Sequence, residues 1–470
     1  MVEGARLESV YTGSRIEGSN PSLSAIIDRY RVLHSKILFL LYKENRMKQI
    51  LKITMICIVL LISNFNLVNA HTISKEQAQY LAAWTSLAVY NDKFSLLARE
   101  ILRENNWQID VYNERIAKSD VKYLLASNRE NNQDCYFLSI SGTSSWQDVK
   151  TDLNVETTAF SGNNVQAFAE NLTDTVLEKD KPLVHKGFLT YVQDGFFTAN
   201  NQGEIVGLSI AQNLRANPQA KIYIVGHSLG GAVAELFAAR LLDLGVASSQ
   251  IETITFGAPA VGNQIFVDEY EPKLNLTRIT MSGDIITGLA QIANSKLVQF
   301  KTQEQWSLPI IENDKFAHNM LLYFDRAGKI YYDKEGEIIR NQLANTVNPK
   351  IYVAPIAFNF PKELISTTKY IELALLDKMR HSDEAYIVEN DVKVTDYYYQ
   401  AKQIGAKYVI FYEFSAVKMK ENTSNKRYYI SGSKFIYDVD KNLIKGYSAN
   451  TDTSDMSIVQ AALYVENQCK

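Results

Sequence analysis

Apolar and polar positions from residue 73 onward first follow the period of a helix and then that of strands. In the stretch SKEQAQYLAAWTSLAVYNDKF (74–94), apolar residues recur at helical spacing, and Ser74 and Gln77 have the positions of a capping box. Short β-rich runs follow at 121–127 and 135–141. This pattern predicts a helix followed by two strands.

Runs of helical and strand type then alternate through the middle of the chain. They are a helical stretch at 187–214, a strand at 221–226, a helix at 228–244 and strands at 251–256 and 277–281. Strand, helix and strand at this spacing predict an α/β domain with a largely parallel sheet. We place this domain at residues 71–342.

A second pattern begins near Asn341–Pro349 and predicts a smaller α+β domain at 348–470. Its expected elements are a strand at 350–358, a helix at 362–382, a strand at 385–390, a helix at 396–406, strands at 407–417, 427–440 and 443–449, and a helix near 455–467. The seven Tyr residues between 397 and 429 are expected in the core or on a sheet face. No ionisable cluster here indicates catalysis, so we interpret the domain as a binding or docking module.

The segment 47–70 has the pattern of a cleaved secretory signal peptide. Two lysines lie near its start, a short apolar run extends from Ile53 to Ile62, and small residues end it at Ala70. A transmembrane anchor is the alternative, but the apolar run is about half of the residues needed to span a bilayer. We therefore expect cleavage after Ala70 and a secreted or periplasmic protein. Residues 1–46 have no place ahead of a signal peptide, so we interpret them as a mis-assigned, disordered extension with the true start at Met47.

Composition narrows the range of partners. The chain has 470 residues with a formal net charge of −3 at pH 7, and no basic patch stands out, so a nucleic-acid partner is not expected. The cysteines Cys57, Cys135 and Cys469 form neither a disulfide framework nor a zinc-binding spacing. Cys57 lies in the segment expected to be removed. We interpret Cys135 and Cys469 as unrelated thiols, with a bridge between them as the alternative.

The stretch VGHSLGG (225–231) lies between an expected strand and an expected helix and contains the G-x-S-x-G pattern of a nucleophile elbow. Its glycines let the turn close and let a substrate approach Ser228. Serine is a weak nucleophile that needs a base, and the base needs an orienting acid. In this type of fold the chain order is serine, acid, histidine.

Two histidines follow Ser228 in the sequence. His318 lies in the first domain and His381 in the second, so we expect His318 to be the base. Asp284 follows an apolar run and a glycine, as an acid at a strand end would, and is the expected orienting acid. The other acids considered are Asp243, expected to be solvated on the helix after the elbow, Asp268, expected on a helix surface, and Asp314, in a polar run.

Acyl transfer also needs hydrogen-bond donors aimed at the developing oxyanion. The backbone N–H of Leu229, directly after Ser228, is expected to be one of them. The loop SGTSSWQD (141–148) follows an expected strand, and Thr143 in it can offer both an N–H and a hydroxyl. No metal or organic cofactor is needed for this chemistry.

In sequence order, these motifs resemble those of the class 3 lipase family of α/β hydrolases. The similar stretches are SGTSSWQDVKTDL (141–153), VHKGF (184–188), GHSLGG (226–231), TFGAPAVGN (255–263), GDIIT (283–287) and HNMLLY (318–323). The resemblance covers roughly residues 73–335. It implies an α/β-hydrolase fold, structural roles for His185 and His227, a triad of Ser228, Asp284 and His318, and an oxyanion hole at Thr143 and Leu229.

Two departures from the family pattern affect the loop that carries Thr143. Ser141 stands where the family has Arg, and Val149 stands where it has Trp, so the bracing of this loop can differ. The family places a lid between residues 154 and 183, where apolar and acidic residues are mixed in this chain. A lid over an acyl pocket and an ordinary surface insertion both fit that mixture.

The C-terminal domain is similar, more distantly, to the amino-terminal module of TolB and related periplasmic proteins. The stretches IYVAPIAF (351–358) and AKQIGAKYVIFYEFSAV (401–417) and the final paired strands carry this similarity. It implies docking to an envelope component or another protein partner.

The motifs and the family resemblance together predict a serine carboxylester hydrolase that acts on lipid esters at a membrane or lipid interface. Triacylglycerol and phospholipid substrates both fit, and the family resemblance leaves a polymeric or aromatic ester as a further alternative. The alternatives are a catalytically inactive envelope protein that keeps the hydrolase fold, and an acyltransferase with the same triad.

Overall fold

The computed structural model describes most of the chain after residue 72. Residues 1–72 and 73–470 form separate units. The described residues are 31–33, 35, 73–116, 119–130, 133–142, 156–170, 180–200, 202–307, 316–382, 384–388, 396–419 and 427–469. The signal peptide expected at 47–70 lies outside the described residues.

Seven strands form the central sheet of the first half, in the order β1-β2-β3-β6-β7-β8-β9. The pairs from β1 to β3 are antiparallel, and the pairs from β3 to β9 are parallel. The strand bounds are β1 (Gln108–Ile116), β2 (Ser119–Glu130), β3 (Gln133–Ile140), β6 (Lys221–His227), β7 (Ile251–Phe256), β8 (Leu276–Met281) and β9 (Glu304–Trp306). The expected α/β-hydrolase class with a mostly parallel sheet is confirmed.

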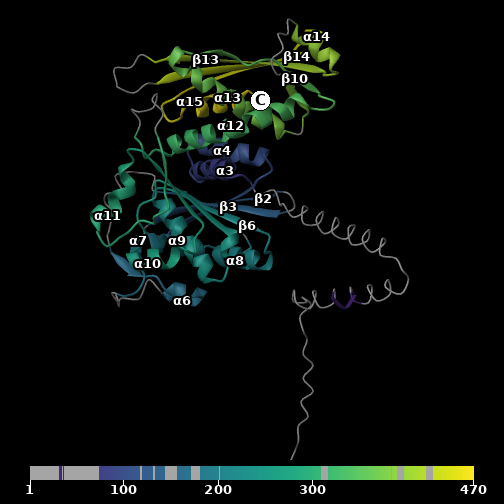
Figure 1. Cartoon of the computed structure of the whole chain (residues 1–470). Helices are drawn as coiled ribbons and strands as arrows, with labels where there is room; N and C mark the ends of the chain where they lie inside the picture. The colour runs from purple at the N-terminus through teal and green to yellow at the C-terminus, as the bar shows by residue number, and fades with distance from the viewer. Residues whose placement is uncertain are drawn as a thin grey trace, which may run out of the picture. The chain divides into compact units, whose positions relative to one another are not determined.

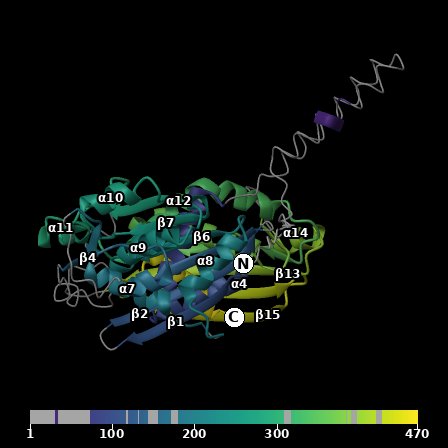
Figure 2. The same cartoon turned by 90° about the horizontal axis from the view of Figure 1, so that it is seen from below.

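Helices cover both faces of this sheet (Figure 1). Phe137 and Tyr223 share a hydrophobic cluster with α3 and α4, whereas Ile222 and Ile224 share one with α7, α8 and α9. Neighbouring residues of β6 thus face opposite helix layers, as the two-residue period of a strand requires. Helix α9 packs against β6 and lies beside it in the view from below (Figure 2). The helix bounds are α3 (Lys75–Ala88), α4 (Lys93–Glu104), α7 (Lys186–Phe197), α8 (Val206–Ala216), α9 (Leu229–Asp243) and α10 (Gln264–Tyr270).

The C-terminal half has its own six-stranded sheet, with β12-β10-β13-β14-β15 in order and β11 paired to β13. Ile410 and Phe414 share a hydrophobic cluster with α13 and α15, while Val409 packs with α14. The smaller α+β part expected from the sequence is therefore present. The bounds are β10 (Ile351–Val353), β11 (Ala357–Asn359), α13 (Ile365–Arg380), β12 (Tyr386–Val388), α14 (Tyr397–Gln403), β13 (Tyr408–Lys418), β14 (Tyr428–Asp438), β15 (Leu443–Asp452) and α15 (Ile458–Gln468).

A long helix, α12 (Met320–Ala344), joins the two halves. It packs against α3 and against α13, and the helices stack between the two sheets (Figure 1). One hydrophobic cluster extends from Leu124 of the first sheet to Ile410 of the second, so residues 73–470 form a single compact unit. The domain boundary expected between 342 and 348 falls at the end of this helix. His318 lies just before its start.

Two expected helices are each divided in the structure. The run at 74–94 becomes α3 and α4, because Asp92 begins a new helix by accepting from the amides of Phe94 and Ser95. The run at 187–214 becomes α7 and α8, because a turn with Gly203 at φ +80° separates them. Strand β1 and helix α12 were not among the expected elements.

The described part of segment 154–183 packs into the molecule. It forms β4 (Thr157–Ala159), which pairs with β5 (Leu183–His185), and the short helix α6 (Val165–Glu170). Phe160 and Phe168 are buried, and the Arg240 guanidinium lies 3.7 and 4.2 Å from their ring centroids. These residues are fixed to α9 rather than lying as a loose flap. Residues 154–155 and 171–179 lie outside the described residues.

Cys135 and Cys469 are both buried free thiols. Their interpretation as unrelated thiols therefore agrees with the structure. Within the described ranges, no helix combines the length and the apolar character needed to cross a membrane.

Candidate active site

Ser228 lies at the turn between β6 and α9, with φ 59° and ψ −128°. This left-handed conformation is strained for a residue with a side chain, at a cost of about 1–3 kcal/mol, and such strain concentrates at functional sites. The flanking glycines are needed because the helix approaches the sheet closely. A Cβ on Gly226 would lie 2.3 Å from the Gly230 backbone, and one on Gly230 would lie 2.2 Å from the Ile140 carbonyl oxygen. Ser228 therefore has the geometry of a nucleophile elbow.

His318 and Asp284 form a buried pair beside the elbow. His318 Nδ1 donates to Asp284 Oδ2 over 2.8 Å, and both side chains are less than a tenth exposed. Asp284 follows β8 and caps the short helix η3 (Ile285–Gly288), with Oδ1 accepting from the Ile286 amide at 3.0 Å. Burial alone raises the pKa of the Asp284 carboxyl. The hydrogen bond and charge interaction with His318, together with the hydrogen bonds from Tyr323 and the Ile286 amide, outweigh burial, so this pKa lies below its usual value.

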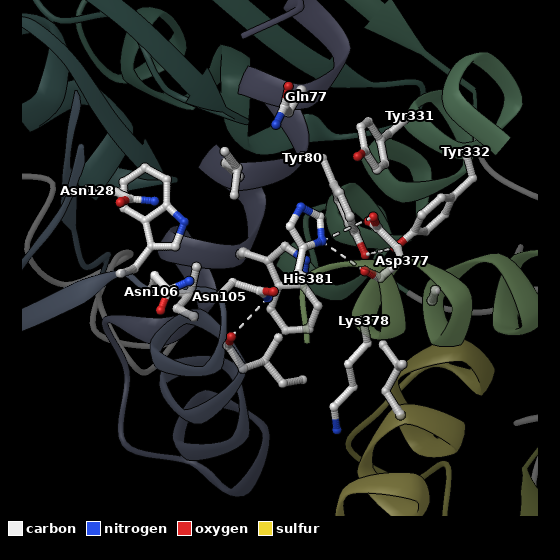
Figure 3. A pocket seen from close by; sticks show the side chains of 17 residues that line it. Gln77, Tyr80, Asn105, Asn106, Asn128, Tyr331, Tyr332, Asp377, Lys378 and His381 are labelled. Carbon is white, nitrogen blue, oxygen red and sulfur yellow. Dashed lines mark hydrogen bonds and ion pairs between the residues drawn. The ribbon is translucent and has the colours of Figure 1, made fainter. Parts of the chain in front are cut away.

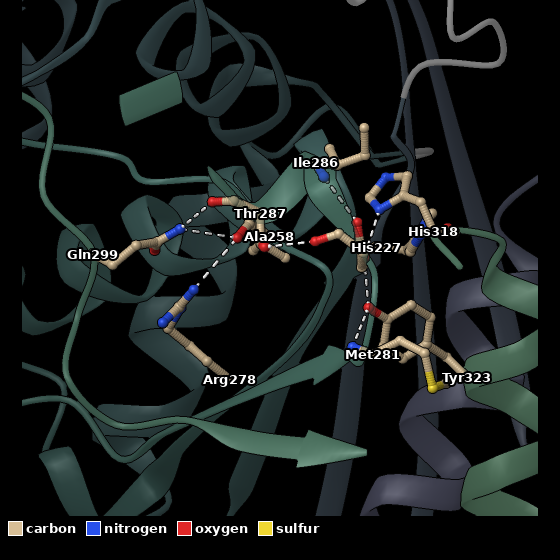
Figure 4. Close-up of polar contacts among 10 residues, drawn as sticks. His227, Ala258, Arg278, Met281, Ile286, Thr287, Gln299, His318 and Tyr323 are labelled. Atoms are coloured by element: carbon tan, nitrogen blue, oxygen red, sulfur yellow. Dashed lines mark hydrogen bonds and ion pairs between the residues drawn. The ribbon is translucent and has the colours of Figure 1, made fainter. Parts of the chain in front are cut away.

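Tyr323, which the sequence reasoning missed, completes the surroundings of Asp284 (Figure 4). Its hydroxyl donates to Asp284 Oδ2 at 2.6 Å and accepts from the Met281 amide at 2.8 Å. Burial raises the pKa of Tyr323 far above its ordinary value, so the phenol remains a neutral donor. The signal in the sequence was its place at the end of HNMLLY, where it falls on the first turn of α12 after His318.

Gly257 of the TFGAP stretch leaves the space that this pair occupies. It has φ +62°, and a Cβ there would lie 2.7 Å from Asp284 Oδ2 and 3.0 Å from the His318 ring. The Ser228 amide donates to the carbonyl of Phe256, the residue before Gly257, at 2.9 Å. The strand end at 256–257 therefore contacts both the nucleophile turn and the imidazole.

His227 and His185 have structural contacts, as expected. His227 Nε2 donates to the His318 carbonyl at 2.7 Å, and His185 Nδ1 accepts from the Phe188 amide at the start of α7. Burial lowers the pKa of His227 to about 3 and that of His185 to about 4, so both rings are neutral near pH 7. His227 thus holds the backbone of the expected base and is not itself placed to act as one.

The expected oxyanion donors are only partly described. Leu229 is the first residue of α9, and no described residue accepts from its backbone N–H. Gly142 lies beside the elbow, because a Cβ on it would be 2.8 Å from the His227 carbonyl oxygen and 3.3 Å from Ser228 Cβ. Thr143, the next residue, lies outside the described residues, as does Val149.

Residues 137–293 match the family model described as lipase (class 3). This segment belongs to the class 3 lipase family. It begins in β3 and ends in the short helix α11 (Leu289–Ala293), so it contains Ser228 and Asp284. His318 and Tyr323 follow it.

Curated relatives of the class 3 lipase segment align over short stretches. The chain is 43% identical over 70 residues to lipase ZK262.3 of Caenorhabditis elegans, which is 14% of this chain and 20% of that protein. It is 32% identical over 109 residues to phospholipase A(1) DAD1 of Arabidopsis thaliana, which is 23% of this chain and 24% of that protein. The chain thus spans about a quarter or less of these relatives' length.

Solved structures of fungal lipases align over about half of the chain. The Rhizomucor miehei triacylglyceride lipase has 21% identity and a TM-score of 0.37, with coverage of 49% of this chain and 78% of that one. The lipase of Rhizopus microsporus var. chinensis has 20% identity and a TM-score of 0.34, with coverage of 46% and 70%.

Two side chains brace the loops of the class 3 lipase segment around Gly257 and Asp284 (Figure 4). Gln299 donates to the carbonyls of Thr287 at 2.7 Å and Ala258 at 3.3 Å, and Arg278 donates to the Ala258 carbonyl at 3.5 Å. Arg278 also lies 3.7 Å from Glu235 of α9, which is completely buried. These contacts tie the loop after β7, the loop after β8 and the elbow helix to one another.

Asp243, Asp268 and His381, the other described candidates, do not reach this site. Asp268 is exposed on α10, as expected, and Asp314 lies outside the described residues. The expectation that Asp243 is solvated was wrong. Its side chain is mostly buried, it accepts from the Tyr270 hydroxyl at 2.8 Å, and burial raises its pKa to about 6. His381 lies at the end of α13, where its Nδ1 donates to the Asp377 carbonyl at 2.8 Å.

A separate cavity of about 210 Å³ lies among α3, α4, α12 and α13 (Figure 3). Aromatic side chains such as Tyr80 and Tyr332 line it together with Asp377 and His381. The hydroxyls of Tyr80 and Tyr332 are 3.1 Å apart, and Tyr332 donates to Asp377 at 3.4 Å. The polar groups of this cavity therefore bind one another across the junction of the two halves.

Proposed function

We propose that the protein is a serine carboxylester hydrolase that acts on lipid esters through an acyl-serine intermediate. The observation that carries this proposal is the conjunction of a strained Ser228 at a strand-to-helix turn with the buried His318–Asp284 pair beside it. A scaffold without activity has no physical need for that combination.

The proposed reaction uses each group in turn. Asp284 holds Nδ1 of His318, which leaves Nε2 as the basic nitrogen. Ser228 Oγ attacks the acyl carbonyl and gives its proton to Nε2, and the carbonyl oxygen becomes an oxyanion facing the Leu229 N–H. The bond to the alcohol then breaks, His318 protonates the alcohol, and water releases the acyl group by the same steps.

The surroundings of the pair support a lipid substrate. Ile285, Ile292 and Phe316 are 62, 81 and 47% exposed. Ile285 directly follows Asp284, Ile292 lies in α11, and the Phe316 ring centroid is 6.0 Å from that of His318. Exposed apolar side chains around a site are typical of contact with lipid. The relatives named as a lipase and as a phospholipase A(1) extend this proposal to both triacylglycerols and phospholipids.

The main test is reaction with a fluorophosphonate probe, followed by a lipid panel. We expect the wild type to be labelled and Ser228→Ala not to be. Triacylglycerol, phospholipid and lysophospholipid are then incubated separately, and the released acids are identified. An unlabelled wild type would support the inactive-scaffold alternative, and acyl transfer to an added alcohol in preference to water would support the acyltransferase.

The proposed contact between the apolar surroundings of the site and lipid is tested by a matched pair of variants. Ile292→Asp places a charge in the apolar surroundings of the site, and Val347→Asp places one at an equally exposed position (80%) after α12. We expect only Ile292→Asp to weaken binding to emulsified triacylglycerol, with hydrolysis of a soluble short-chain ester unchanged. Equal binding by both variants would contradict this role.

A secreted or periplasmic location is part of the same proposal, on the strength of the signal-peptide pattern at 47–70. Amino-terminal sequencing of the natural protein tests it. A mature start after Ala70 is the expected result, and peptides from before Met47 would contradict it.

A further inference from the structure

Tyr90, at the turn after α3, is part of the active-site wall. Its hydroxyl accepts from the Gly142 amide at 2.8 Å. A Cβ atom placed on Gly142 would lie 3.2 Å from the Tyr90 hydroxyl oxygen and 3.3 Å from Ser228 Cβ. The phenol oxygen and the nucleophile therefore border the same small space.

The hydrogen bonds of Tyr90 leave its proton available. A tyrosine hydroxyl can accept and can donate one hydrogen bond. The Gly142 amide takes the acceptor role, and none of the described residues accepts the proton. Burial raises the pKa of Tyr90 to about 12, so the proton stays on the oxygen at neutral pH.

Arg99 of α4 holds the turn that carries Tyr90. Its Nε donates to the Ala88 carbonyl at 2.6 Å, and its Nη2 donates to the Tyr90 carbonyl and to Asn91 Oδ1. Two of these bonds hold the backbone at Ala88 and at Tyr90 itself, and the third holds the Asn91 side chain, all from one planar guanidinium. The phenol is therefore placed before any substrate binds, which is what an electrostatic contribution to catalysis requires.

We propose that the Tyr90 hydroxyl donates a hydrogen bond to the oxyanion of the tetrahedral intermediate, together with the Leu229 N–H. Tyr90 is then a catalytic residue supplied by the turn after α3, outside the matched lipase segment. No proton is transferred in this role. The phenol dipole stabilises the negative charge that develops on the carbonyl oxygen when Ser228 attacks. This charge disappears when the intermediate collapses and the carbonyl forms again. This inference rests on the proposed hydrolase function.

Tyr90→Phe removes the donor and keeps the ring. Loss of one oxyanion donor typically costs about 10²-fold or more in rate, and we expect kcat on a soluble ester to fall by that order with KM little changed. Tyr123→Phe is the matched control, because the Tyr123 hydroxyl also makes a 2.7 Å bond to a backbone group, the Tyr191 carbonyl. We expect this control to keep wild-type kcat.

A second variant separates donation to the oxyanion from support of the Gly142 loop. Replacing Tyr90 with 3-fluorotyrosine makes the phenol a stronger donor and a weaker acceptor. Donation to the oxyanion predicts a higher kcat than in the wild type, whereas a role limited to accepting from Gly142 predicts a lower one. A lower or unchanged kcat would overturn the proposal, as would Tyr90→Phe activity equal to that of Tyr123→Phe.

The outcomes also distinguish this inference from the function beneath it. If the wild type neither reacts with the fluorophosphonate probe nor hydrolyses any ester, the hydrolase proposal fails and takes the role of Tyr90 with it. If the wild type is active through Ser228 and Tyr90 changes have no effect, only the role of Tyr90 fails.

Discussion

Two clusters in this molecule join a histidine, an aspartate and a tyrosine, and they differ in what surrounds the aspartate. In the first, Asp284 accepts from His318 at 2.8 Å and from Tyr323 at 2.6 Å, and its third partner is a backbone amide. In the second, Arg380 donates to Asp377 at 2.6 Å, while His381 Nδ1 is 3.6 Å from the carboxylate.

The difference shows why residue types alone do not define a catalytic site. The partners of Asp284 other than His318 are neutral donors, so its charge remains to orient the imidazole and to stabilise it when it takes a proton. The charge of Asp377 is already matched by Arg380. His381 is 45% exposed and lies at a helix end without a strained serine beside it. The second cluster joins the two halves of the molecule and has no described nucleophile.

Removing the histidine of each cluster is expected to give the largest difference in activity between them. For a serine hydrolase, loss of the base costs about 10⁶-fold in kcat, and we expect a loss of that order in His318→Ala. His381→Ala changes a half-exposed residue and is expected to keep activity within about twofold. The measurement is kcat on a soluble ester at equal concentrations of folded protein. A large loss in His381→Ala would contradict the assignment of the base.

Removing each aspartate's charge should separate activity from stability. Asp284→Asn leaves the shape intact but disturbs the imidazole, for which about a 10⁴-fold loss of kcat is typical. Asp377→Asn leaves the mostly buried Arg380 without its carboxylate, which we expect to lower the free energy of unfolding by about 1–3 kcal/mol while kcat is kept. Denaturant unfolding and kcat are measured for both variants. The comparison fails if Asp377→Asn loses activity without losing stability.

The triad could be predicted from the sequence because motif order and fold class restrict the choice strongly. Ser228, Asp284 and His318 each follow a strand or precede a helix of the first half, and the structure brings Asp284 and His318 into contact. Strand β1 and helix α12 were missed, because polar residues interrupt their apolar positions and the partners that bury them are remote in sequence. Tyr90 and Tyr323 were missed for a related reason. Tyr90 follows α3 and Tyr323 lies in the first turn of α12, and tertiary packing brings both to the site. The HNMLLY stretch places Tyr323 near His318 in sequence but does not indicate a function for its hydroxyl.

The tyrosine of each cluster gives a smaller test. A hydrogen bond to a charged group contributes about 1.5–3 kcal/mol, and about 1.4 kcal/mol of barrier changes a rate tenfold. Because only part of the bond's energy acts on the transition state, we expect kcat to fall about tenfold in Tyr323→Phe. Tyr332→Phe, which loses the 3.4 Å contact with Asp377, is expected to keep kcat. Equal rates in the two variants would remove Tyr323 from the active site.

Tyr323→Phe and Tyr332→Phe are also expected to differ in the pH at which they unfold in acid. The pKa of Asp284 is raised by burial, but its bonds with His318 and Tyr323 bring it below the ordinary value. A carboxyl with a lowered folded-state pKa stabilises the fold above its unfolded pKa of about 3.9, and this stabilisation is lost as the pH falls through the folded-state value. Without the Tyr323 hydroxyl the folded-state pKa rises toward the unfolded one, so less stabilisation is present at neutral pH and it is lost at a higher pH. We therefore expect the midpoint of acid unfolding, followed by tryptophan fluorescence, to move upward in Tyr323→Phe relative to Tyr332→Phe. An equal shift of the midpoint in both variants would contradict this prediction. It would mean that the Tyr323 hydroxyl does not specifically lower the pKa of Asp284.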